Sequence, residues 1–158
     1  MKKLLIALYC GVACHCALAE NLTFHGRLVT PPICTINNNQ TIEVPFDEVD
    51  IDEINGANFA KEVPYTITCD SSVRFSSMSM TLTLLGTPVD FDNAAVETTV
   101  NGLGIQLRQN DSAFTVGSTI TIDEQAKPTI KAVPVKKTGV ALQEGAFEGW
   151  ATLQVDYQ

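Results

Sequence analysis

Histidine is scarce in this chain, which has only 2 among its 158 residues, His15 and His25. Zinc and copper sites need several His or Cys ligands, and a hydrolase with a serine nucleophile needs a histidine beside it. A pair of carboxylates that cleaves glycosides stays open, because any two acidic residues can meet in a folded chain. Without any sign of a cleft for such a pair, the sequence predicts no metal site, no cofactor and no enzyme.

Lysine and arginine are also scarce, with 10 basic against 18 acidic residues and a net charge of −8. Loss of Lys2 and Lys3 with a signal peptide would leave 8 − 18 = −10. This balance argues against nucleic acid or an anionic membrane as a partner. Acidic residues cluster between positions 47 and 53, but the cluster lacks the spacing and the glycine of a calcium loop and is interpreted as a solvated loop.

Long hydrophobic runs are absent except near the amino terminus, where residues 4–13 follow two lysines. This run is well short of the roughly 20 residues that span a bilayer, and small residues follow it at Ala17 and Ala19, as signal peptidase requires. We expect residues 1–19 to be a secretory signal peptide, residues 20–158 to form one exported domain, and no segment of it to insert in a membrane.

Only two cysteines remain once the predicted signal peptide is removed, because Cys10, Cys14 and Cys16 leave with it. In an oxidising compartment the remaining pair, Cys34 and Cys69, is expected to form a disulfide. Closing 69 − 34 = 35 residues would stabilise the fold by about 4 kcal/mol if the bridge acts through chain entropy.

Apolar and polar residues alternate in several short segments, whereas no segment has the pattern of an amphipathic helix of a dozen residues. A period of two is typical of half-buried strands. It predicts strands at residues 21–29, 41–46, 65–69, 78–84, 103–108, 118–122, 129–137 and 145–158, with a loop at residues 47–61 and a polar stretch at 87–101 in which no strand is predicted. Short strands separated by turns predict an all-β antiparallel sandwich of immunoglobulin type.

The last predicted strand has an apolar face but no obvious partner. A hydrophobic strand at a terminus leaves an open edge, so we expect another strand to pair with it. Its apolar face comprises Phe147, Gly149, Ala151, Leu153, Val155 and Tyr157.

The first predicted strand is separated from the rest by two prolines. Its apolar face comprises Leu22, Phe24, Gly26 and Leu28. Pro31 and Pro32 cannot donate to a sheet ladder and force extended geometry on the residue before each. Residues 21–29 are therefore either a detached strand or the first strand of the sandwich, and periodicity alone leaves both open.

Several of these features together resemble the minor pilin subunits of chaperone–usher fimbriae, above all the tip-fibrillum and adaptor subunits of the P-pilus type. The residues that carry the resemblance are the alternating segment 22–28 with Gly26 among its inward-facing residues, the run 32–37 around Cys34, Cys69 at the end of Tyr-Thr-Ile-Thr-Cys, Gly145 as the fourteenth residue counted from the end, and the penultimate Tyr157. Together they cover the whole of residues 20–158.

The resemblance implies an incomplete immunoglobulin-like sandwich that lacks its final strand. In this family a periplasmic chaperone fills the open groove first, and the amino-terminal extension of the next subunit replaces it at the outer-membrane usher, a known case of strand addition. It further implies residues 1–19 as signal peptide, 20–32 as extension and 33–158 as pilin domain, exported through the periplasm to a cell-surface fimbria, where the protein would serve in cell adhesion.

The same resemblance assigns roles to individual residues. Leu22, Phe24 and Leu28 would be plugs of the donor strand, with Gly26 where the groove is shallow. The acceptor groove and chaperone contact would comprise Gly145, Phe147, Ala151, Leu153, Val155 and Tyr157, and basic chaperone residues would anchor the Gln158 carboxylate. The partners would be the chaperone, the usher and neighbouring pilin subunits or an adhesin.

Two other classes of function remain open from the sequence. A tip adhesin would bind a receptor directly, but it would need a receptor-binding domain beyond the one expected here. A self-contained secreted β-sandwich that acts as a binding module would use residues 21–29 as its own closing strand and would be stable as a monomer.

Overall fold

The computed structural model describes residues 22–158. The predicted signal peptide, residues 1–19, lies outside the described residues. Among residues 22–158, η1 (Asn37–Asn39) is the only helical turn, and no helix is long and apolar enough to cross a membrane. All remaining elements are short strands, so the prediction of an all-β chain is confirmed.

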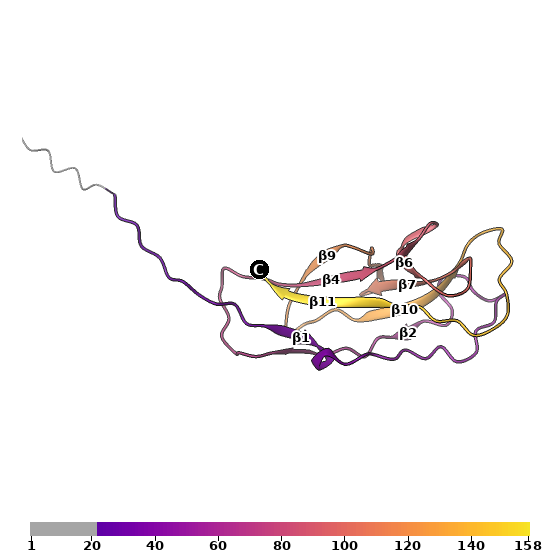
Figure 1. The fold of residues 1–158 in the computed structure, drawn as a ribbon, viewed down its shortest axis with the longest axis horizontal. Coiled ribbons are helices and arrows are strands. Elements are labelled where there is room, and N and C mark those ends of the chain that lie inside the picture. Colours follow the sequence, from indigo (N-terminus) through magenta and orange to yellow (C-terminus); the bar gives the residue numbers. More distant parts are fainter. Residues whose placement is uncertain (1–21) are drawn as a thin grey trace, which may run out of the picture.

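Two antiparallel sheets form the body of the molecule (Figure 1). The larger sheet has the order β2 (Lys61–Glu62), β10 (Ile130–Lys136), β7 (Leu103–Gln109), β6 (Asp92–Glu97) and β5 (Pro88–Val89), and β8 (Ser112–Ala113) pairs with β7. The smaller sheet has the order β11 (Ala151–Tyr157), β4 (Met80–Gly86) and β9 (Thr119–Ile122). β11 therefore lies at an edge.

A single hydrophobic core lies between the two sheets. Leu82 and Leu84 of β4 are fully buried, and Ile105 and Leu107 of β7 contribute to the same core from the opposite sheet. Each fully buried side chain of this kind stabilises the fold by about 1.5 to 3 kcal/mol. The alternation in the sequence therefore marks the inward faces correctly in both strands.

Strands β3 (Ile67–Cys69), β4, β7, β9 and β10 fall within or next to predicted segments. The sequence predicts no strand in the polar stretch 87–101, and the structure has β5 and β6 there. β6 buries Ala94, Ala95 and Val96 in succession, which breaks the period of two, and alanine is itself depleted in strands.

Two other segments that were predicted as strands form no backbone pairing with another segment in the structure. Residues 41–46 and 22–29 belong to no strand, although Ile42, Val44 and Phe46 are half-buried while the residues between them are exposed. The final strand begins at Ala151, six residues later than predicted. A strand exists only where a second backbone pairs with it, and alternation alone does not supply that backbone.

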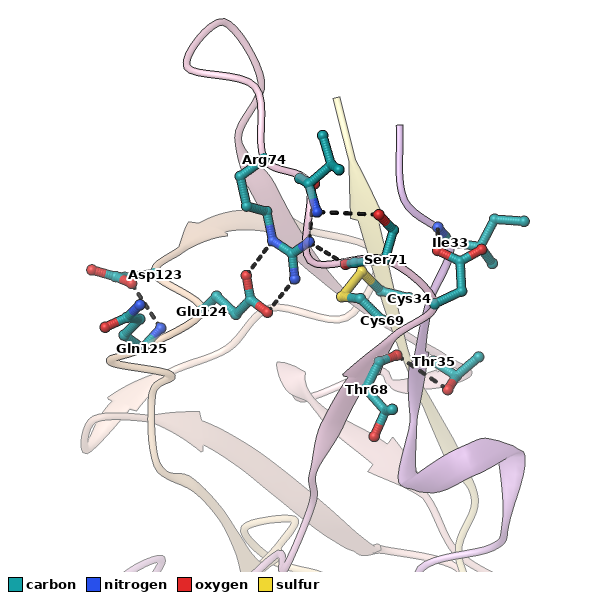
Figure 2. A network of polar contacts seen from close by, with 12 residues as sticks. Ile33, Cys34, Thr35, Thr68, Cys69, Ser71, Arg74, Asp123, Glu124 and Gln125 are labelled. Atoms are coloured by element: carbon teal, nitrogen blue, oxygen red, sulfur yellow. Dashed lines mark hydrogen bonds and ion pairs between the residues drawn. A yellow bond between two sulfur atoms is a disulfide. The ribbon is translucent and has the colours of Figure 1, made fainter. Parts of the chain in front are cut away.

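The predicted disulfide joins Cys34 to Cys69, with an S–S distance of 2.05 Å. The two residues lie directly opposite each other in a small antiparallel sheet of β1 (Cys34–Ile36) and β3. The Ile33 amide donates to the Asp70 carboxylate at 2.9 Å, so a polar contact continues the pairing beyond the bridge (Figure 2). Together they fix the point where the extension leaves the sandwich.

We expect the fold to lose stability at alkaline pH because of Tyr65. Its hydroxyl donates to the Pro128 carbonyl at 2.6 Å, and burial raises the pKa of Tyr65 to about 12, above its usual value of about 10. Below pH ~10 the contribution is fully present. As the pH rises towards 12 the unfolded chain loses this proton first, so the free energy of unfolding falls.

Urea unfolding between about pH 8 and 12 measures this effect, with Tyr65→Phe as the comparison. The variant should be less stable at pH 8 by about 1 kcal/mol, because it lacks the hydrogen bond. Its stability should then decline less steeply with pH than that of the wild type. Parallel curves for the two proteins would contradict the prediction.

Candidate functional site

A long groove of about 1470 Å³ runs along the edge of the sandwich beside β11. Its first wall is the segment 39–49 and its second wall is the segment 142–153. We refer to these segments as the first wall and the second wall. Both come from parts of the chain that lie about a hundred residues apart, and both are largely extended without a strand partner.

The first wall has strand-like alternation but an unpaired backbone. Within the described chain, no hydrogen bond involves the backbone of residues 41–49. Ile42, Val44 and Phe46 nevertheless pack against the core, so this segment follows the sandwich as an edge strand would. Its amide and carbonyl groups are free to pair with an incoming strand, as an exposed strand edge does.

The second wall is paired on one side only. Its β11 part is hydrogen-bonded to β4, with Leu153 opposite Leu84 and Val155 opposite Leu82. Before β11, the Thr99 amide donates to the Glu148 carbonyl at 2.9 Å. Gly145 has a φ of +143°, a backbone conformation that residues with a side chain rarely adopt.

The floor of the groove is apolar and belongs to the core. Leu84 of β4 and Ile105 of β7 are buried, and both line the groove from opposite sheets. Val96, Leu107 and Ala132 also line it. Apolar side chains entering between the walls would therefore contact the hydrophobic core directly.

The two walls meet at an aromatic pair. The ring centroids of Phe46 on the first wall and Phe147 on the second wall are 5.8 Å apart, with the rings tilted by 46°. Both side chains are half-buried and pack against the core. Tilted pairs at this distance attract each other, so this contact holds the walls together at one point along the groove.

Four of the six predicted acceptor residues line this groove: Gly145, Phe147, Ala151 and Leu153. The other two, Val155 and Tyr157, lie further along β11, where Val155 is buried in the core and Tyr157 is half-buried. The role of each as a contact of an incoming strand stays a prediction. Sequence reasoning missed the first wall as part of the site, although its alternation was visible.

The four predicted donor residues lie outside the sandwich. The exposed fractions of Leu22, Phe24 and Leu28 are 73%, 86% and 102%, and a Cβ added to Gly26 would meet nothing within 4 Å. Figure 1 shows this segment leading away from the two sheets. Within residues 22–158, no backbone hydrogen bond involves residues 22–30, so the extension contributes no strand to its own sandwich.

The far end of β11 is held by Arg74. The Arg74 guanidinium forms a two-point ion pair with Glu124 (Figure 2). It also lies over the Tyr157 ring, 5.4 Å from its centroid. The hydrogen bond from Arg74 lowers the pKa of Glu124. Gln158 and Ser79 exchange two backbone hydrogen bonds. Sequence reasoning missed Arg74, because its partners lie far away along the chain.

Comparison with known proteins places the chain among fimbrial sequences. Residues 22–158 match the model of the family described as "Fimbrial protein". The chain is 44% identical over 162 residues to the fimbrial-like protein YfcQ of Escherichia coli, with 100% of both chains covered. It is 31% identical over 163 residues to YfcR of the same species, covering 96% of this chain and 91% of that protein.

Two solved structures share its fold. The P pilus adaptor subunit PapF matches with a TM-score of 0.60 at 24% identity, over 81% of this chain and 97% of that one. The P pilus rod subunit PapA matches with a TM-score of 0.61 at 20% identity, over 87% of this chain and 99% of that one. The predicted incomplete immunoglobulin-like sandwich agrees with both.

We expect Arg74→Met to loosen the end of β11. Methionine keeps the apolar stem of the side chain but loses the ion pair with Glu124, the hydrogen bond to the Ser71 carbonyl and the cation over Tyr157. Amide exchange of Gln158, whose N–H is bonded to the Ser79 carbonyl at 3.0 Å, should become faster, while amides of β7 stay unchanged. Hydrogen exchange followed by NMR measures both.

Acid pH provides a second check on this contact. Because Arg74 lowers the pKa of Glu124, the contribution of the pair is present above the usual carboxyl pKa of about 4.3 and is lost as the pH falls below it. The exchange rates of the wild type and Arg74→Met should therefore converge in acid. Lys131→Met is the control: it removes the exposed ion pair between Lys131 of β10 and Asp111. It should leave the amide exchange of Gln158 unaffected.

Proposed function

The chain belongs to the fimbrial protein family and is a structural subunit of a pilus, not an enzyme, and from this premise we propose that it is assembled by donor-strand exchange. In this scheme its groove accepts an extended strand from a partner, and its own extension fills the groove of a neighbour. The observation that carries the proposal is the groove itself, whose two walls have unpaired backbone above an apolar floor.

The described extension has the properties that a donor strand requires. Leu22, Phe24 and Leu28 are exposed in the free chain, and burying each in a neighbour's groove would contribute about 1.5 to 3 kcal/mol. Together these contributions are of the order of a small domain's entire stability, roughly 5 to 15 kcal/mol. A lone subunit would therefore be only marginally stable, and a subunit whose groove holds a donor strand would be much more stable.

We further propose residues 20–32 as the donor extension and joint, and residues 33–158 as the pilin domain. A periplasmic chaperone would occupy the groove until the outer-membrane usher replaces it with the next extension, consistent with export to a surface fimbria. Residues of the second wall would contact both strands in turn. The wall's Gly145, Phe147, Ala151 and Leu153, followed by Val155 and Tyr157 on β11, would form this contact.

Within the fibre we propose a minor position, at the tip or as an adaptor. This position is supported by the sequence resemblance to tip-fibrillum and adaptor subunits. The fold does not distinguish it from a rod position, because an adaptor and a rod subunit match the fold about equally well. A self-contained binding module is less favoured, because it would use residues 22–29 as its own closing strand, and these side chains are exposed.

The proposal is tested by purifying the exported protein with and without its chaperone and measuring thermal unfolding. The lone protein should melt at low temperature or aggregate, because its groove leaves apolar floor and backbone uncovered. Added chaperone, or a peptide from a neighbour's extension, should raise the melting temperature. A high-melting monomer indifferent to both would overturn the proposal.

Phe24→Asp should block the donor role without affecting the acceptor role. A carboxylate at this position would have to enter the apolar groove of the neighbour, so we expect the extension to bind at least about 100-fold more weakly. Secretion and chaperone binding should be normal, because the groove is unchanged. Incorporation into fibres, followed by immunoblotting of sheared pili, measures the effect.

Thr23→Asp is the matched control for this prediction. It introduces the same charge one residue earlier, on the face of the extension that would lie away from the groove. We expect this variant to be incorporated, although more slowly where the neighbour's rim is acidic, because an exposed charge changes the association rate by about tenfold and leaves the buried contacts of the extension intact. If Phe24→Asp polymerises as well as Thr23→Asp, the donor assignment is wrong.

A further inference from the structure

The rim of the groove carries charge of one sign. Five charged residues line the groove, all of them acidic and all exposed: Glu43, Asp47 and Glu48 on the first wall, and Glu144 and Glu148 on the second. Neither wall contains Lys, Arg or His. Asp47 forms an ion pair with Lys61 at 3.2 Å, and no ion pair of the described residues involves the other four.

The extension of the same chain carries the opposite charge. Between residues 22 and 32 the ionisable side chains are His25 and Arg27, and no acidic residue is present. Both alternate with the apolar residues, on the face of Thr23. A strand whose Leu22, Phe24 and Leu28 point to the floor of a groove must direct His25 and Arg27 outward.

The outward face of such a strand lies between the two walls, at the level of their exposed side chains. Arg27 would then lie on the same face as the carboxylates of both walls. Neighbouring strands bring opposed side chains within reach of each other, and opposite charges there attract while like charges repel. An extension with acidic outward residues would instead meet repulsion at this rim.

We propose that the groove of this subunit takes the extension of a second copy of the same chain, and that the rim carboxylates select a strand with a basic outward face. This inference rests on the proposed donor-strand function and adds to it the identity of the occupant. The rim residues are exposed, so their effect falls mainly on the rate of association and on its dependence on salt. Of the two positions proposed above, a second copy as occupant fits a tip position held by more than one copy and excludes a single-copy adaptor.

Peptides test the charge selection. The acceptor is the Phe24→Asp chain, which keeps its groove but cannot donate, and the probes are synthetic peptides of residues 21–31. One peptide is wild type, one carries His25→Gln with Arg27→Gln, and one carries Arg27→Glu. Trp150, the single tryptophan of the chain, lines the groove, so its fluorescence reports binding.

The wild-type peptide should associate about tenfold faster than the Arg27→Glu peptide at low salt, with the neutral peptide between them. The difference should largely vanish near 1 M salt, where the Debye length is only about 3 Å and exposed charges farther apart are screened. Equal rates for all three peptides at every salt concentration would overturn the charge selection. Binding by none of them would instead overturn the proposed function.

Oligomerisation of the protein itself tests the second copy as occupant. Wild-type chain, refolded from urea with its disulfide intact at rising concentration, should form oligomers in size-exclusion chromatography with light scattering. At low salt Arg27→Glu should slow their formation, and a second substitution, Glu144→Lys on the rim, should restore the rapid appearance of oligomers. Glu62→Lys on β2, exposed and outside the groove, is the control and should not restore it.

Each outcome of this experiment decides one point. Rescue by Glu144→Lys but not by Glu62→Lys supports contact between the extension and the rim of another copy. A wild-type chain that stays monomeric at all concentrations, although its own peptide binds the groove, would overturn the second copy as the occupant. Rescue by both lysines alike would overturn the rim as the site of selection.

Discussion

The structure depends on an edge that has no partner. β11 is hydrogen-bonded only to β4, and across the groove the first wall makes no backbone pairing in the described chain. Backbone groups need partners when they are removed from water, and the apolar floor between them needs cover. One added strand meets both needs, because its backbone pairs with the walls while alternate side chains reach the floor. The remaining features hold the two walls in place for it.

Three contacts hold the two walls in place. The disulfide between Cys34 and Cys69 joins β1, just before the first wall, to β3. Arg74 packs on Tyr157 at the end of β11, beyond the second wall. Between them, Phe46 and Phe147 join the walls at one point. A preorganised groove loses less conformational freedom when a strand enters it. The extension, in contrast, precedes Pro31 and Pro32 and lies away from the sandwich. Its apolar side chains are exposed and can contact another molecule.

The groove and the extension are complementary in charge as well as in hydrophobicity. The groove combines an apolar floor with an acidic rim, and the extension combines an apolar face with a basic one that contains Arg27. Hydrophobic burial is nondirectional and supplies most of the binding free energy. Rim charges contribute less to affinity but distinguish one strand from another and speed the encounter. The same surface can therefore bind tightly and still be selective.

The sequence by itself determined the all-β class, the inward faces of β4, β7 and β11, and the single disulfide. These follow from local alternation and from a count of cysteines. Only the tertiary structure decided that residues 41–49 face β11 without pairing, that β6 buries Ala94, Ala95 and Val96 in succession, and that Arg74 reaches Glu124 and Tyr157. Alternation records which side of a strand is buried, whereas pairing and ion contacts depend on segments far apart in the chain, which no local pattern specifies.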